Sequence, residues 1–375
     1  TSKKGNSNKM SFNLKANFGT YSKGMKEYKT LNPKQYMEVS WLDYRNNLVT
    51  NSKMSVADAS QYATENLVNK VLKINIFDKP GNQLFDSNGK LVADANILDG
   101  YKDDLDWYDQ ATRHGFRQEY NFSGNQMGTK SDSYFSLGYV NEDGYLKNSA
   151  FERLNGRLAM NYRPYSWFNT GFSMMGSHQK SNIAEGNASE SNRYTNAFFF
   201  CRTIAPVYPV HKHNVDGSYL LDSNGDVQFD TGDNESRNQY LDRNIIYENQ
   251  LNSNKTVRNS IYGSAYATLK FLDDFSFTVK LDGNEVDHGK RNYFNAVVGD
   301  GKGLNGMMQS YKYRTKNYTF QQQLNWGRHF GEHSVSVLLG HENFSYSYDY
   351  DYLYKTNQTF AGKDNASNFS TVAGS

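Results

Sequence analysis

Residues Phe275–Asp282 read FSFTVKLD, and this alternation decides the fold class. Every odd-numbered residue in it is apolar, and every even-numbered residue is polar or charged. Because successive side chains of a β-strand point to opposite faces, the segment predicts a strand with one apolar and one polar face. The same alternation recurs at Met10–Phe18, Phe135–Tyr139 and Leu154–Tyr162. The sequence therefore predicts an all-β protein built from two-faced strands.

The connections between these segments switch between short and long. We count about nine strand-like segments, joined in order by roughly 96, 8, 12, 4, 81, 3, 33 and 6 residues. The short connections near Asn125–Asp132, Arg163–Ser166, Leu272–Asp274 and Arg328–His333 are expected to share one rim. Short turns at one rim and long loops at the other are typical of bacterial outer-membrane β-barrels. The prediction is an antiparallel up-and-down transmembrane β-barrel, partial at about nine strands, with long and partly helical extracellular loops.

Alternation alone leaves a second fold open, a soluble β-sandwich in which the apolar face meets another sheet. Composition favours the barrel, since the chain holds 29 Tyr and 23 Phe but only 5 Pro. Aromatic residues near strand ends suit the membrane interface, although strands favour aromatic residues in any setting. The aromatic residues expected near strand ends are Tyr120, Tyr139, Tyr162, Trp167, Tyr318 and Trp326.

Other global features exclude several classes of protein. A net charge of +2 gives no reason to expect a nucleic-acid partner. No apolar run approaches the roughly 18 residues of a membrane-spanning helix. The single cysteine, Cys201, forms neither an internal disulfide nor a metal site by itself. The chain has no initiating Met and no signal peptide, and an odd count of strands would leave two unpaired edges, so we expect a truncated barrel.

Several segments carry a family resemblance. They read TSKKG at Thr1–Gly5, GFRQEYNFSG at Gly115–Gly124, SYFSLGYVNEDGYLKN at Ser133–Asn148, FERLNGRL at Phe151–Leu158, IAPVYPV at Ile204–Val210 and LLGHE at Leu338–Glu342. In this order and at these spacings they resemble the SusC/RagA-type TonB-dependent transporters of Bacteroidetes outer membranes. The resemblance implies that residues 1–375 are the N-terminal portion of the β-barrel domain, with the plug domain and the remaining strands absent from the chain.

The resemblance also implies a function. Such transporters lie in the outer membrane of Gram-negative bacteria, in contact with the lipid bilayer. They import oligosaccharides, or in some members peptides, together with a SusD-like surface lipoprotein, and are energised through TonB. The TonB-contacting segment would lie outside this chain. The alternative is a passive porin or a surface adhesin built on a similar barrel.

The two longest loops contain recognisable local structure. In the first, about Ser22–Arg117, the pair Asn32-Pro33 predicts a helix start, and Ser55 with Asp58 predicts a second helix over Val56–Leu72. We expect these helices to pack the loop onto itself rather than to contact a ligand. In the other, about Ser177–Val257, Asp222–Asp226 reads DSNGD, which resembles a calcium loop but predicts a hairpin tip more strongly. A second such turn is expected at Asp86–Gly89.

The candidate cargo-binding residues lie on these loops. Binding sites pair an apolar or aromatic wall with a few placed polar groups. Two clusters have this chemistry, and their residues are Asp104, Asp106, Trp107 and Tyr108, and Phe199, Arg202 and Tyr208. The alternative for Trp107 is a packing role, in which it anchors the loop against the barrel mouth.

No enzyme or cofactor site is predicted. His211 and His213 lack a third metal ligand nearby in the sequence, so we expect no metal there. Gly301, Gly303 and Gly306 match a dinucleotide-binding spacing without the strand–turn–helix context that such a site needs. No nucleophile and base are paired, and the prediction is a protein without catalytic residues and without cofactors.

Overall fold

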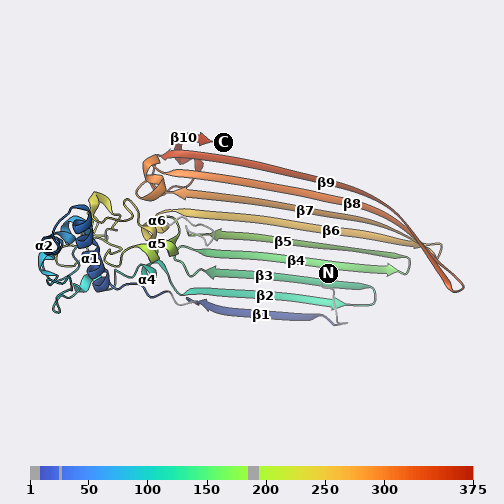
Figure 1. The fold of residues 1–375 in the computed structure, drawn as a ribbon. Coiled ribbons are helices and arrows are strands. Elements are labelled where there is room, and N and C mark those ends of the chain that lie inside the picture. The colour runs from blue at the N-terminus through green and yellow to red at the C-terminus, as the bar shows by residue number, and fades with distance from the viewer. Residues whose placement is uncertain (1–8, 25–27, 185–193, 375) are drawn as a thin grey trace.

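The computed structural model describes residues 9–24, 28–184 and 194–374. Within them the strands form one antiparallel sheet in strict chain order, β1 to β10 (Figure 1). The strands are β1 Ser11–Tyr21, β2 Gly115–Met127, β3 Ser131–Asp143, β4 Ala150–Tyr165, β5 Phe168–Asn182, β6 Ser253–Phe271, β7 Phe275–Phe294, β8 Met307–Phe330, β9 His333–Gln358 and β10 Phe369–Gly374. The predicted up-and-down antiparallel architecture is confirmed.

The strand count and several strand ends differ from the prediction. A tenth strand, β10, pairs with the end of β9 at Tyr354–Gln358. β7 continues to Phe294, so the connection to β8 covers only residues 295–306 instead of the predicted 33 residues. The reason is chemical: beyond Leu281 both faces of β7 carry polar residues, and the alternation that marks a strand in the sequence disappears.

The pairing register places all apolar stripes on one side of the sheet. On β6, β7 and β8, Leu269, Phe277 and Leu324 lie opposite one another. The adjacent row holds Thr268, Thr278 and Gln323, and the two threonine hydroxyls lie 3.0 Å apart. We call these two sides the apolar face and the polar face.

The apolar face is uncovered. Its large side chains are extensively exposed, and among the described residues no second sheet packs on it. At its β1 edge the rings of Phe12, Phe122 and Phe135 contact one another, with centroids 5.6–6.3 Å apart. A row of exposed apolar side chains across a sheet is costly in water and stable against lipid. The face therefore fits a membrane barrel. A soluble sandwich would need a second sheet against this face, and the described residues form none.

Aromatic residues mark the edges of the apolar face. Near the short turns, Phe275 contacts Phe271 and Trp326, with centroids 5.6 and 6.5 Å apart. Towards the long loops, Tyr120 and Tyr139 form a cross-strand pair on the same face. Aromatic rings at two levels of one face are the arrangement of the girdles at membrane interfaces.

The helices all lie beyond one end of the sheet, the end that carries the long loops (Figure 1). They are α1 Pro33–Asn51, α2 Val56–Asn66, α3 Asp99–Lys102, α4 Trp107–Ala111, α5 Ala197–Thr203 and α6 Ile245–Leu251, with a π-helical turn at Leu67–Leu72 and 3₁₀ turns at Gly81–Gln83, Asp233–Glu235, Gly299–Leu304 and Ala366–Asn368. Asn32 caps α1 through a reciprocal capping box with Gln35. None of the described helices is long and apolar enough to cross a bilayer.

Every described connection at the opposite end of the sheet is a tight turn, at residues 128–130, 166–167, 272–274 and 331–332. The four predicted short connections therefore share one rim, as expected. We call this end the turn rim and the other end the loop rim.

Both predicted hairpin tips are present at the loop rim. Leu221 and Val227 pair across the Asp222–Asp226 turn, where Gly225 has a φ of 87°. Phe85 and Leu91 pair across the second turn. The side chain of Asp222 accepts hydrogen bonds from its own turn, so the turn is stabilised without a metal.

Candidate functional site

The two long loops fold together into one body, which we call the loop layer. Its core contains Trp41, Leu67 and Phe200, all buried. The main cross-link runs through Tyr208, whose carbonyl accepts a hydrogen bond of 2.8 Å from the indole nitrogen of Trp107. The phenol of Tyr208 donates to the carbonyl of Leu72 at 3.1 Å. Burial raises the pKa of this phenol, so it stays protonated and remains a donor.

Asp104 forms a second cross-link. Its carboxylate is fully buried and lies 2.6 Å from His211 Nδ1 and 2.9 Å from His213 Nε2. Burial opposes its ionisation, but the hydrogen bonds from the two imidazoles outweigh this and hold the pKa of Asp104 below its usual value. His213 in turn stacks on Tyr101, with ring centroids 4.1 Å apart.

The histidine pair therefore has a carboxylate partner that lies far away in the sequence. Both ring nitrogens of His213 face acceptors, Asp104 Oδ2 and the carbonyl of Gly217, each at 2.9 Å. A metal ion at His213 would therefore have to displace one of these two contacts. Across the described residues, no group of three or more His, Cys, Asp and Glu side chains has the arrangement of a metal site.

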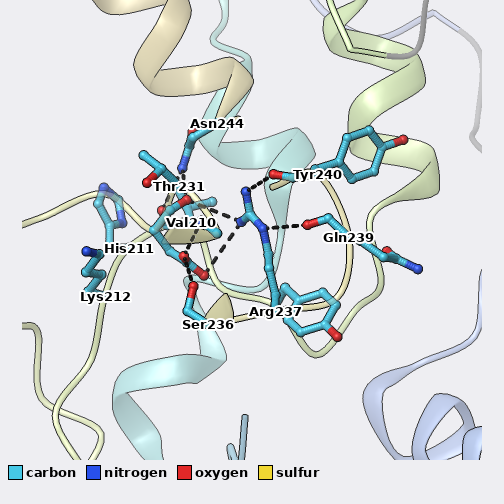
Figure 2. Close-up of polar contacts among 12 residues, drawn as sticks. Val210, His211, Lys212, Thr231, Ser236, Arg237, Gln239, Tyr240 and Asn244 are labelled. Atoms are coloured by element: carbon cyan, nitrogen blue, oxygen red, sulfur yellow. Dashed lines mark hydrogen bonds and ion pairs between the residues drawn. The ribbon is translucent and has the colours of Figure 1, made fainter. Parts of the chain in front are cut away.

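A buried arginine organises the loop that precedes α6 (Figure 2). The side chain of Arg237 is completely buried, and its guanidinium donates to the carbonyls of Gln239, Tyr240 and Asp230 at 2.9, 2.9 and 3.2 Å. Its charge is balanced by the Asp230 carboxylate at 3.6 Å, while burial lowers the pKa of Arg237. Asn244 donates to the carbonyls of Val210 and Asp230 from the other side. The contacts of Arg237 satisfy backbone carbonyls, so its role is structural.

A groove of about 750 Å³ opens on the loop layer, between the first long loop and the loop that contains α5. Its lining includes Tyr28, Tyr36, Asp106, Tyr108, Arg202 and Pro206. Tyr108 stands between the two loops, because its hydroxyl donates to the carbonyl of Phe198 at 3.3 Å and Lys23 lies 4.5 Å from its ring centroid. Aromatic walls with a few charged groups suit a sugar or a peptide segment.

The structure separates the seven candidate residues into two groups. Asp106, Tyr108 and Arg202 line the groove and are partly or fully accessible. Phe199 is 40% exposed but lies outside the groove lining. The other three are buried, since Asp104 and Tyr208 are 0% exposed and Trp107 is 2% exposed, although Trp107 forms part of the groove floor.

Two aromatic residues of the groove lining, Tyr28 and Tyr36, are absent from the candidates that the sequence suggested. Tyr36 is visible in the sequence only as part of the apolar periodicity of α1, which predicts packing. Tyr28 precedes α1 and belongs to no recognisable pattern. Both reach the groove because the first loop folds back on the second, which sequence spacing does not reveal.

Comparison with known proteins agrees with this geometry. No protein-family model matches the chain. The TonB-dependent receptor P39 of Formosa agariphila is 25% identical over 243 residues, which cover 63% of this chain and 20% of that receptor. The RagAB peptide importer in its closed-closed state aligns with 99% of this chain, with a TM-score of 0.65 and 14% identity. The SusC/RagA-type resemblance is confirmed.

The open-open state of the same RagAB peptide importer aligns similarly, with a TM-score of 0.63 and 15% identity over 99% of this chain. The chain spans a fifth of the length of receptor P39 and 38–39% of the importer chains. The chain is thus similar in sequence to part of a TonB-dependent receptor and in fold to part of the importer.

Proposed function

We propose that residues 1–375 form part of the barrel wall and loop layer of an outer-membrane importer in a Gram-negative bacterium. The observation that carries the proposal is the difference between the two rims of the sheet. Among the described residues, the connections at one rim are tight turns, the other rim carries a folded loop layer with a groove, and the apolar face between them is uncovered. This arrangement suits a wall that crosses a membrane and presents its loops to the outside.

In this proposal the cargo is an oligosaccharide or a peptide, held first by the groove on the loop layer. Tyr108 and Tyr36 would supply aromatic surface, and Asp106 and Arg202 would orient polar groups of the cargo. The Asp104 and Tyr208 cross-links would support the groove without touching the cargo, since both are fully buried, and Trp107 would support it from the floor. A SusD-like surface lipoprotein would cover the loop rim.

Energy would come through TonB, which would act on a plug domain in another part of the longer protein. The chain would then be the N-terminal portion of the barrel domain, and further strands would close the barrel. The modest share of the relatives that this chain spans is consistent with such a division.

Uptake by living cells tests the proposal. The full-length gene is deleted and restored, and uptake of fluorescent oligosaccharide and peptide pools is measured with and without TonB. Import is expected only in the restored strain with TonB present. Uptake that continues without TonB would replace this proposal with the passive porin, and the absence of uptake together with loss of surface attachment would replace it with the adhesin.

A further inference from the structure

The polar face of β8 and β9 carries a wall of tyrosines beyond the level of the membrane. The apolar face of β8 ends at Tyr318, after which Lys316, Arg314 and Lys312 follow on the same side. Trp326 and Tyr318 are eight residues apart, which is roughly 27 Å of strand and about 19 Å of depth at a tilt of about 45°, most of the roughly 25 Å apolar band of a barrel. The charged side chains that follow on the lipid-facing side indicate that β8 leaves the hydrocarbon shortly beyond Tyr318.

Ion pairs mark the outer side of this extended wall. Arg314 contacts Asp287 at 3.0 Å and Glu285 at 3.7 Å, and Lys316 also contacts Glu285 at 3.7 Å. These residues continue the apolar face into solvent or the headgroup layer, where charged side chains are stable. The outer side above the membrane is thus charged.

The opposite side of the same strands is aromatic. We define the tyrosine wall as six residues of the polar face, namely Tyr311, Tyr313, Tyr346, Tyr348, Tyr350 and Tyr352. Tyr311 pairs with Tyr352 and Tyr313 with Tyr350, and their ring centroids are 4.9 and 5.0 Å apart.

The rings continue along β9 beyond these pairs and remain accessible. Tyr348 lies 6.4 Å from Tyr313, and Tyr346, Tyr348 and Tyr350 are 57%, 51% and 49% exposed. Because alternate residues of a strand are about 7 Å apart, the rings of β9 form a continuous strip.

Charge is segregated between the two sides of this segment. Between Gln309 and Thr319 of β8, and between Phe344 and Tyr354 of β9, the residues of the polar face include no Asp, Glu, Lys or Arg. The other side of the same segments holds Lys312, Arg314, Lys316, Asp349 and Asp351. On the neighbouring strand β7 one charged residue of the same face, Lys290, lies opposite Tyr311 at the edge of the wall. The wall's own two strands supply no charge to the interior side of this stretch, so most of its surface does not complement a charged cargo.

We infer that the tyrosine wall is a second cargo-binding surface, and that it takes a neutral oligosaccharide. The inference rests on the proposed import function and names its substrate class. Tyrosine supplies an apolar ring for the C–H face of a sugar and a hydroxyl for its polar edge. A peptide would bring charged termini and side chains of both signs to a wall whose own strands supply no charge and whose nearest charged neighbour on that face is the cation of Lys290, opposite Tyr311. The strip runs along β9 and so gives an extended chain successive rings from the loop rim towards the barrel interior.

The alternative explanation is strand propensity, because tyrosine stabilises strands and cross-strand aromatic pairs. That explanation predicts a loss of stability when the rings are removed and no specific loss of binding. It also gives no reason for rings and charges to occupy opposite faces. Binding and stability must therefore be measured on the same variants.

The test uses the purified full-length protein and an array of neutral oligosaccharides, acidic oligosaccharides and peptides, followed by calorimetry on the ligands retained. Three triple variants are compared. Y346S/Y348S/Y350S removes the rings, Y346F/Y348F/Y350F keeps them, and S345A/S347A/D349N changes the other face of the same stretch of β9. Heat-resistant mobility in detergent shows that each variant has a folded barrel.

The wild-type protein is expected to retain neutral oligosaccharides, the serine variant to bind them about tenfold or more weakly, and the other two to bind within about threefold of wild type. The inference is overturned if the serine variant binds neutral oligosaccharides as tightly as the wild type does, or if the phenylalanine and serine variants lose affinity equally. It is also overturned if the protein retains only peptides or acidic sugars. An array that retains no neutral sugar would overturn it too. If the cells take up a peptide in a TonB-dependent manner, the proposed import function holds and the tyrosine-wall inference fails. If the wall binds a neutral sugar but cells take that sugar up without TonB, the inference holds and the proposed active import fails.

Discussion

Substitution of Phe277 by arginine probes the membrane placement of the sheet directly. Phe277 belongs to a row of the apolar face that is apolar across four strands, with Leu269 on β6, Leu324 on β8 and Leu339 on β9. An arginine there finds no polar side chain directly opposite it on either neighbouring strand. The next row is less informative, because Val279 lies beside Gln322, which contacts His341.

The size of the expected destabilisation depends on how deep Phe277 lies in the bilayer. The apolar band on β7 runs from Phe275 to about Gly283, so its centre lies near Val279. Phe277 is two residues from that centre, which is about 7 Å along the strand and roughly 5 Å in depth for a strand tilted by about 45°. Arginine at the midplane of a barrel costs about 2–4 kcal/mol, and the cost falls towards the interface. We therefore expect Phe277→Arg to lower the free energy of unfolding by about 2 kcal/mol.

Thr278→Arg is the matched control. Its side chain lies on the polar face between Thr268 and Gln323, on the same side as Lys280. A charge there remains in water, and the expected cost is within about 0.5 kcal/mol. Both full-length variants are unfolded with guanidinium from lipid vesicles, and surface levels are compared in cells. An equal cost at both positions, or a larger cost for Thr278→Arg, would show that the apolar face does not meet lipid.

Three further predictions concern the loop rim and the turn rim of the full-length protein. Epitope tags at residues 128–130 should be inaccessible on intact cells and tags at residues 222–226 accessible, and labelling of the first set alone would invert the topology. Trp107→Ala should destabilise the loop layer by about 3–5 kcal/mol, seen as a lower melting temperature, because it removes a buried ring and its hydrogen bond. Tyr108→Ala should keep the melting temperature within a few degrees of wild type and lower the affinity for cargo. If the Trp107 variant instead binds cargo weakly and melts normally, Trp107 contacts cargo and the assigned roles are reversed. Because the folded loop layer lowers the pKa of Asp104, the ionised carboxylate stabilises the loop layer at pH values above the ordinary carboxyl pKa of 3.8. This stabilisation should be lost as the pH falls through 3.8 and below it. Asp104→Asn should flatten the acid transition followed by tryptophan fluorescence, and an unchanged transition would remove the carboxylate from this role.

The candidate site shows where sequence reasoning stops. Trp107 and Tyr108 are adjacent in the chain and have similar chemistry. Trp107 is 2% exposed in the core of the loop layer and reaches only the groove floor, whereas Tyr108 is accessible in the groove beside Phe198. Adjacent residues at the start of a short helix, α4, point in directions about 100° apart, so burial depends on what packs against each side. That neighbour is Tyr208, about a hundred residues away in the chain.

Local sequence patterns were sufficient to predict the elements that depend only on interactions between residues close together in the chain. The Asn32 capping box, the Asn-Gly hairpin tip and the alternation of β7 each depend on residues within a few positions of one another, so the sequence alone determined them. The two-sided sheet followed as well, because a period of two assigns every side chain of a strand to a face.

Only the tertiary structure decided the rest. The full length of β7 was hidden because a strand with solvent on both sides loses its alternation. The carboxylate between His211 and His213 comes from a different loop, as do the walls of the groove. The segregation of tyrosines from charges also became meaningful only once the register aligned β8 with β9, since pairing across strands, and not spacing along one, determines which side chains share a surface.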